Sequence, residues 1–111
     1  MLIYRFDSSL VFFNADYFKS RVRALVREAS APVRVFLLDA ETMSYLDTTG
    51  AAVLDQVCVD LEREGITVAV AAAKSPVRTM LERTRLAQRI GPDRMFSTVH
   101  SAVEALRKAR L

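Results

Sequence analysis

The stretch Met43-Ser44-Tyr45-Leu46-Asp47-Thr48-Thr49-Gly50 decides how this chain is expected to fold. An apolar run, residues 33–38, lies before it, and apolar residues at helical spacing follow it. A buried strand that leads into an amphipathic helix is the repeating unit of α/β proteins. The stretch therefore predicts an α/β fold, and it places one carboxylate and two adjacent hydroxyls in a turn at the start of a helix.

Two apolar runs, Val33–Leu38 and Ile66–Ala72, are typical of strands in the interior of a sheet. Each is continuously apolar rather than alternating, which indicates burial on both faces. The helix between them is expected to be capped by Asp47 or Thr48 and to end at Gly65, so the two strands are predicted to be parallel with a right-handed crossover. The core positions predicted from these runs are Val35, Leu37, Val68 and Val70.

The N-terminal region predicts a β-hairpin that begins almost at Met1, as in a domain cut from a longer chain. Leu2–Phe6 and Leu10–Phe13 are rich in β-branched and aromatic residues, and Asp7-Ser8-Ser9 between them supplies turn chemistry. Asn14 is a candidate N-cap for the helix that follows. The aromatic side chains here are expected to be mostly core, or alternatively one or two form an exposed docking patch: Phe12, Phe13, Tyr17 and Phe18.

The C-terminal half predicts two further helices and one short strand. Ser75-Pro76 indicates a helix start with the hydroxyl as N-cap, residues 94–96 indicate a last strand, and Ser97 or Thr98 is expected to cap the final helix. Together with the hairpin, these elements predict a mixed central sheet of about four to five strands with about four helices packed on it. Residues 1–111 are predicted to form a single domain.

Composition argues against several classes of function. The 111 residues carry a net charge of +3, and the basic residues are spread along the chain rather than gathered in a stripe, so no nucleic-acid partner is expected. Cys58 is expected to be a small buried hydrophobe, and one Cys with one His cannot form a closed zinc site, so no metal is expected. The longest smoothly apolar stretch, residues 66–73, is far shorter than the roughly 20 residues of a membrane span, and the isolated chain is expected to be soluble.

The candidate site is the turn formed by Asp47, Thr48, Thr49 and Gly50. Ligands of open α/β sheets bind at the carboxyl ends of strands, and free N–H groups at a helix start favour anions. The turn could therefore bind an anion or a partner, or accept a phosphate on a hydroxyl. In a purely structural alternative, it is a helix cap with a glycine for close packing, and loss of the Thr48 side chain would then cost about 1 kcal/mol.

Other polar groups give weaker signals. The Arg-rich segment 78–94 indicates either a solvated face or contacts to an anion or partner, for which Arg78 and Arg85 are the candidates. His100 lies within the last predicted helix, and the acidic residues of the second helix fall on its outer face. Because no nucleophile, acid and base converge in this pattern, we expect no catalytic residue and no enzyme.

Taken together, these residues resemble a STAS domain, the sulfate transporter and anti-sigma factor antagonist fold. The similarity runs from Leu2 to Leu106, and its carriers are the Leu46–Gly50 turn, the two buried strands and the helix start Ser75-Pro76-Val77. In anti-sigma factor antagonists the turn reads Asp-Ser-Ser/Thr-Gly, and its first hydroxyl accepts phosphate. The matching position here is Thr48, where threonine stands in place of the usual serine.

A second match concerns residues 10–18, Leu-Val-Phe-Phe-Asn-Ala-Asp-Tyr-Phe, which resemble the Leu-Phe-Phe-Ala-Asn-Ala opening of STAS domains in SulP-type anion permeases. This resemblance implies the cytoplasmic C-terminal domain of a sulfate or related anion transporter. Its partners would be the membrane domain of the parent chain, which moves the anion, and a regulatory protein. The alternatives are a free-standing anti-sigma factor antagonist switched by phosphorylation at Thr48, and a module that binds a nucleotide near residues 47–50; no other cofactor is expected.

Overall fold

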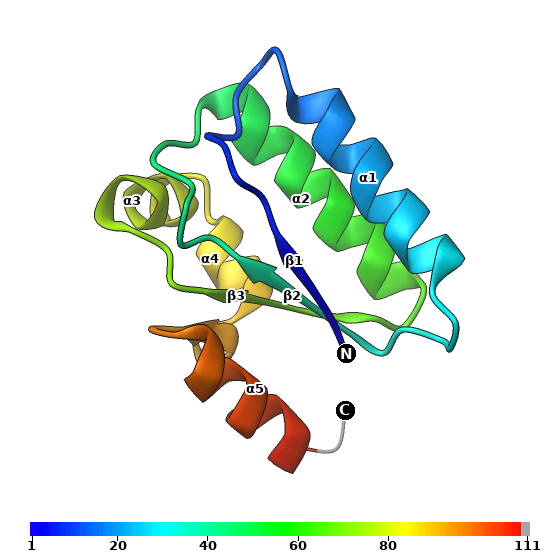
Figure 1. Cartoon of the computed structure of the whole chain (residues 1–111). Coiled ribbons are helices and arrows are strands. Elements are labelled where there is room, and N and C mark those ends of the chain that lie inside the picture. Colours follow the sequence, from blue (N-terminus) through cyan, green and yellow to red (C-terminus); the bar gives the residue numbers. More distant parts are fainter. Residues whose placement is uncertain (110–111) are drawn as a thin grey trace.

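A computed structural model of the chain describes residues 1–109 and shows an α/β fold (Figure 1). The elements alternate between strand and helix from β1 to α3, and the C-terminal part adds short helices and a short edge strand. In chain order they are β1 (Leu2–Arg5), α1 (Ala15–Glu28), β2 (Val35–Asp39), α2 (Thr48–Arg63), β3 (Thr67–Ala71), α3 (Ser75–Arg83), α4 (Leu86–Ile90), a 3-10 turn η1 (Pro92–Arg94), β4 (Met95–Phe96) and α5 (Val99–Lys108).

The sheet has four strands in the order β1-β2-β3-β4, and every neighbouring pair is parallel. The register places Leu2 opposite Phe36 and Val35 opposite Thr67. The two apolar runs therefore form the central strands, as predicted, but the sheet is parallel throughout and the predicted mixed sheet is wrong. Because all strands run the same way, their carboxyl ends meet at a single edge, which is where the loops that carry the candidate site begin.

The predicted N-terminal hairpin does not form. β1 ends at Arg5, and the chain then leaves the sheet instead of turning back along it. Leu10 makes only an isolated parallel bridge to Leu46. The Asn14 side chain explains this course: it makes no cap bond to α1, but its Oδ1 accepts from the Val11 N–H at 2.9 Å and its Nδ2 donates to the Ser9 carbonyl at 2.8 Å, so it closes a loop.

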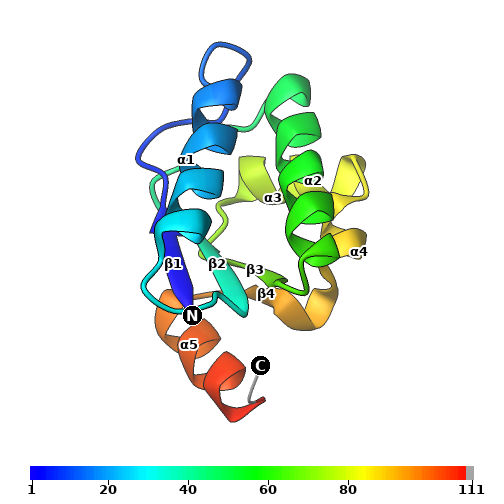
Figure 2. The same cartoon turned by 90° about the vertical axis from the view of Figure 1, so that its right-hand side faces the viewer.

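The two faces of the sheet are covered by different helices. Alternate strand residues face opposite sides, so Phe36, Leu38, Val68 and Val70 pack with the helices α1 to α4 in the larger apolar cluster. Val35 and Leu37 face the other side and pack against α5. Figures 1 and 2 show α1 and α2 side by side on one face and α5 alone on the other. The four predicted core residues are confirmed as buried: Val35, Leu37, Val68 and Val70.

The helix ends follow the sequence signals in most cases. Gly65 has a φ of 78° just after α2, and Thr98 caps α5 by accepting from the Ser101 N–H at 3.0 Å. The prediction for Ser75 is wrong, because Lys74 takes the N-cap position of α3 without any side-chain cap bond, and Ser75 is already helical. The short helix α4 follows Arg85, whose left-handed backbone breaks the helical run, and it was not expected from the sequence.

Candidate functional site

The turn between β2 and α2 is organised around the carboxylate of Asp47, the N-cap of α2. Its Oδ1 accepts from the Gly50 N–H at 2.7 Å, which satisfies one of the free donors of the first helical turn. Its Oδ2 accepts from the Phe12 N–H at 2.9 Å, and Phe12 lies in the loop between β1 and α1. One side chain therefore joins two loops that are 35 residues apart in the sequence.

The same two loops are also joined through their backbones. Leu10 donates its N–H to the Tyr45 carbonyl at 3.1 Å, and its own carbonyl accepts from the Asp47 N–H at 3.2 Å. This close approach explains Gly50: a Cβ at that position would lie 2.8 Å from the carbonyl carbon of Leu10 and closer still to its oxygen. The backbone at Gly50 has no positive φ, so its conformation would allow other residues. Glycine is required because there is no space for a Cβ atom.

Both hydroxyls of the predicted site are exposed. Thr48 and Thr49 are the first two residues of α2, and their side chains face solvent beside the buried Gly50. Because they begin the helix, their backbone N–H groups have no acceptor within it. Asp47 rather than Thr48 provides the cap, and the predicted role of the turn as a phosphate acceptor or as a binding site for an anion or partner stays a prediction.

The two candidate arginines are not bonded to this turn. Arg78 lies in α3 and donates from Nη2 at 3.0 Å to the carbonyl of Ala73, which is in the turn between β3 and α3. Arg85 sits between α3 and α4 with a φ of 63°. No hydrogen bond or ion pair within residues 1–109 connects either guanidinium to Asp47 or its neighbours. Their predicted roles as contacts to an anion or a partner stay predictions.

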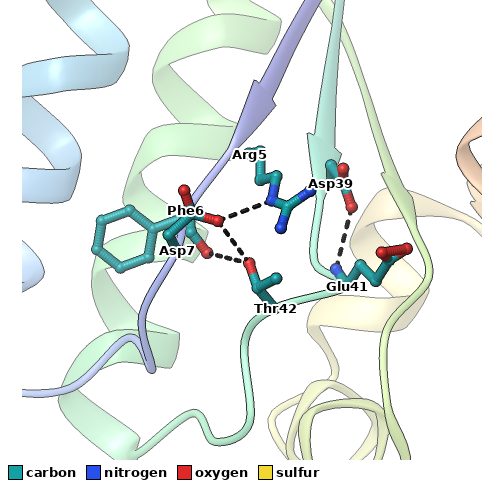
Figure 3. A network of polar contacts seen from close by, with 6 residues as sticks. All are labelled: Arg5, Phe6, Asp7, Asp39, Glu41 and Thr42. Atoms are coloured by element: carbon teal, nitrogen blue, oxygen red, sulfur yellow. Dashed lines mark hydrogen bonds and ion pairs between the residues drawn. The ribbon is translucent and has the colours of Figure 1, made fainter.

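A polar network at the carboxyl ends of β1 and β2 was not foreseen from the sequence (Figure 3). Arg5 donates from Nε to Asp7 Oδ1 at 2.7 Å, and the Thr42 hydroxyl donates to the same oxygen at 3.0 Å. The Arg5 bond, followed by the Thr42 bond, lowers the pKa of the Asp7 carboxyl below its ordinary value. Asp39, a buried carboxylate, accepts from the Glu41 N–H at 3.0 Å and turns the chain after β2.

The exposure of the aromatic side chains near this edge differs most from what the sequence predicted. Phe18 is buried in the core, but Phe12, Phe13 and Tyr17 are 72%, 76% and 61% exposed, so the expectation that they are mostly core is wrong for all three. The rings of Phe12 and Phe13 meet edge to face with centroids 5.6 Å apart. The available signal was their adjacency, because neighbouring residues in a short loop cannot both point into one core. Tyr45, which was given no role from the sequence, is 50% exposed.

The remaining reactive groups lie outside this region. Cys58 is buried, as predicted, and burial raises the pKa of its thiol to about 12, so it is not a nucleophile at neutral pH. His100 is exposed on α5, and its Nε2 lies 3.2 Å from Oε1 of Glu104, one helical turn away. Within residues 1–109 there is no cluster of three or more metal-ligating side chains.

Comparison with known proteins identifies the family. The STAS domain model matches residues 1–102, and the chain therefore belongs to the STAS domain family. Over 97% of its length the chain is 36% identical to the probable sulfate transporter Rv1739c of Mycobacterium tuberculosis, of which it spans 19%. Its similarity is thus to the STAS domains of SulP-type sulfate transporters, and the chain spans about a fifth of the length of this relative.

Solved structures show the same fold. The STAS domain of a SulP transporter from Vibrio cholerae aligns with a TM-score of 0.81 at 19% identity, covering 98% of this chain and 82% of that one. A putative anti-sigma factor antagonist from Thermotoga maritima aligns with a TM-score of 0.80 at 19% identity, covering 95% of this chain and 86% of that one. The fold alone therefore does not distinguish the two branches of the family.

Proposed function

We propose that the chain acts as the cytoplasmic regulatory and interaction domain of a SulP-type sulfate or related anion transporter, outside the permeation path. The observation that supports this most is the 36% identity to a probable sulfate transporter over nearly the whole chain, because the fold is shared equally with an antagonist. Across residues 1–109, no helix has the length and apolar character to cross a membrane.

In this proposal the domain works by contact rather than by chemistry. The carboxyl-edge loops present exposed aromatic rings and two exposed hydroxyls, while the one thiol is buried and protonated at neutral pH. We propose the membrane domain of the parent transporter and a regulatory protein as partners, and we expect neither an enzyme activity nor a tightly bound cofactor. A nucleotide at the turn is tested by titration with guanine and adenine nucleotides while the amide signals of residues 40–52 are followed.

The experiment that tests the main proposal is an exchange of domains in the relative. The segment of Rv1739c that matches this chain is replaced by residues 1–111, so that α5 is complete, and sulfate uptake is measured in cells that lack their own uptake system. The matched control carries the Thermotoga antagonist in the same position, since it has the fold without the transporter sequence. Uptake restored by this chain but not by the antagonist supports the proposal; equal uptake from both, or none from either at normal surface expression, contradicts it.

A second candidate function is supported by the exposure of Thr48 at the start of α2. A phosphate there would meet free backbone N–H groups and add up to about two negative charges beside Asp47. Incubation with an anti-sigma kinase, followed by intact mass, tests this role. A mass gain of one phosphate that is lost in Thr48→Ala and kept in Thr49→Ala supports an antagonist-type switch, and the absence of such a gain argues against it.

A further inference from the structure

The charges of this chain are unevenly distributed, and the loops around the candidate site are acidic. Residues 5–17 and 39–49, the two segments at the carboxyl ends of β1 and β2, hold five Asp or Glu side chains and a single Arg. Their net charge of −4 contrasts with the +3 of the whole chain. Asp7, Asp16 and Glu41 of this set are exposed. A ligand that approaches these two loops therefore meets more carboxylates than cations, whereas the neighbouring start of α3 at the same edge carries the exposed Lys74 and Arg78.

Exposed aromatic rings lie at the same end. Phe12 and Phe13 occupy the loop between β1 and α1, which projects beyond the sheet at the end where α2 begins in both views (Figures 1 and 2). Tyr17 follows in the first turn of α1, and Tyr45 lies in the neighbouring loop, where its carbonyl accepts from the Leu10 N–H. Side chains this large are usually buried, and two adjacent phenylalanines that are 72% and 76% exposed form an apolar patch of the kind found at interaction surfaces.

The loop that carries the two phenylalanines is held in place rather than left free. The N–H groups of Leu10, Val11, Phe12 and Asn14 are all hydrogen bonded within the protein. The Asn14 side chain closes the loop from inside, and Asp47 ties it to the start of α2. A loop fixed in this way presents its aromatic pair without an ordering cost on binding, which favours a recognition surface.

We propose that the Phe12–Phe13 loop and its acidic surroundings form a docking surface for an apolar segment flanked by Lys or Arg residues. The apolar side chains of such a segment would cover the two rings, and its cations would face Asp16 and Glu41. Its source rests on the proposed function: the cytoplasmic ends and short loops of a transporter membrane domain are enriched in Lys and Arg beside apolar helix ends. The same charge argues against an anionic membrane surface, because the three exposed carboxylates, Asp7, Asp16 and Glu41, would repel anionic headgroups.

The surface is tested on the chain itself with labelled peptides that tile the part of Rv1739c outside its STAS segment. Fluorescence anisotropy reports binding, and circular dichroism confirms that each variant is folded. We expect only peptides with apolar side chains next to Lys or Arg to bind. Phe12→Ala/Phe13→Ala should weaken binding at least about tenfold, as loss of central aromatic anchors does. Asp16→Asn/Glu41→Gln should weaken it less and reduce its dependence on salt.

The matched control changes two other exposed apolar residues away from the site. Met1 and Ile3 are both 47% exposed, so Met1→Ala/Ile3→Ala removes exposed apolar surface outside the proposed site and should leave binding unchanged. The proposal is overturned if no peptide binds, if bound peptides show no preference for Lys or Arg, or if the Phe and control variants behave alike. Phe-dependent binding to phosphatidylcholine–phosphatidylglycerol vesicles, or Phe-dependent dimers in sedimentation, would overturn it in favour of a membrane or a second copy.

This outcome is separate from that of the domain exchange. Peptide binding at the surface together with failed transport in the chimera would contradict the proposed function and leave the docking surface standing. Restored transport without peptide binding would support the proposed function and contradict the docking surface.

Discussion

The two strand-to-helix turns at the carboxyl edge, β2 to α2 and β3 to α3, have similar positions in the sheet but different internal support. In the first, Asp47 caps its helix and also accepts from Phe12 in a distant loop, and Gly50 lets the Leu10 backbone approach. In the second, Lys74 takes the N-cap position without a side-chain bond, and the Arg78 guanidinium binds the Ala73 carbonyl within the same turn.

This difference shows which turn is coupled to the rest of the molecule. Asp47 contacts Phe12, 35 positions earlier in the chain, and Gly50 lies against Leu10 in the same loop, so a change in the first turn is transmitted to the aromatic loop. The bond of Arg78 spans only five residues, so a change in the second turn stays local. Substitutions in the two turns should therefore differ in how far their effects extend through the molecule.

The largest effect is expected from Gly50→Ala. The added methyl group would overlap the Leu10 carbonyl, and the two backbones would have to separate. Overpacking of this kind destabilises proteins by about 3 kcal/mol when backbone must move. Urea denaturation followed by circular dichroism measures the loss in the free energy of unfolding.

Gly65→Ala is the control for this change. Gly65 has a positive φ of 78°, but a methyl group added there would meet nothing within 4 Å, so only backbone strain opposes the substitution. We expect a cost of about 1 kcal/mol. If Gly50→Ala proved no more harmful than Gly65→Ala, the two loops would not be in close contact in solution.

A smaller loss is expected from Asp47→Ala, which removes the cap of α2 and the acceptor of the Phe12 N–H together. The combined cost should be about 2 kcal/mol, at the upper end of the range for helix caps. Hydrogen exchange should accelerate at the Phe12 and Gly50 amides, the two donors that lose their acceptor. Lys74→Ala, at the equivalent position of the second turn, should change stability by less than about 0.5 kcal/mol.

Slow exchange at Phe12 in Asp47→Ala would mean that the backbone bonds of Leu10 hold the loop without help from the carboxylate. The coupling between the turns and loops would then be a property of the backbone alone.

The sequence allowed the central strands, the core positions and the β2-to-α2 turn to be predicted because each has a local signal. Continuous apolar runs marked β2 and β3, and an Asp-Thr-Thr-Gly sequence after one of them marked the start of α2. The family resemblance rested on the same residues. The prediction that Thr48 lies at the start of a helix therefore needed no knowledge of tertiary contacts.

The N-terminal loop could not be predicted in the same way, because its course depends on partners far along the chain. Asp7-Ser8-Ser9 is good turn chemistry, but Asp7 bonds to Arg5 and Thr42, and Leu10 pairs with residues 45–47. Nothing local shows that the Asp47 carboxylate reaches Phe12. The parallel pairing of β1 with β2 and the exposure of the two phenylalanines were missed, because nothing in the local sequence indicates these long-range bonds.

Thr48→Ala should have little effect on stability, although the sequence pattern allowed about 1 kcal/mol for a lost cap. The structure gives the cap to Asp47 and leaves the Thr48 side chain in solvent, so we expect a change within about 0.5 kcal/mol. Thr49→Ala is the matched control in the same helical turn. A loss in Thr48→Ala clearly above that of Thr49→Ala would assign Thr48 a structural role and weaken the case for a phosphate acceptor.

The smallest effect is expected from the Arg5–Asp7–Thr42 network, which links β1 to the connection before the first turn and has no counterpart at the second (Figure 3). The pKa of Asp7 is lower in the folded chain than its ordinary value of 3.8, so its carboxylate stabilises the fold above that pH. This contribution should be lost as the pH falls below about 4 and through the folded-state pKa. Because the group is exposed, the change should be small. The urea midpoints of wild type and Asp7→Asn should therefore differ slightly at pH 7 and converge at the lowest pH at which both proteins still fold. A difference that stays constant across this pH range would show that the charge of the Asp7 carboxylate does not hold Arg5 and Thr42 together.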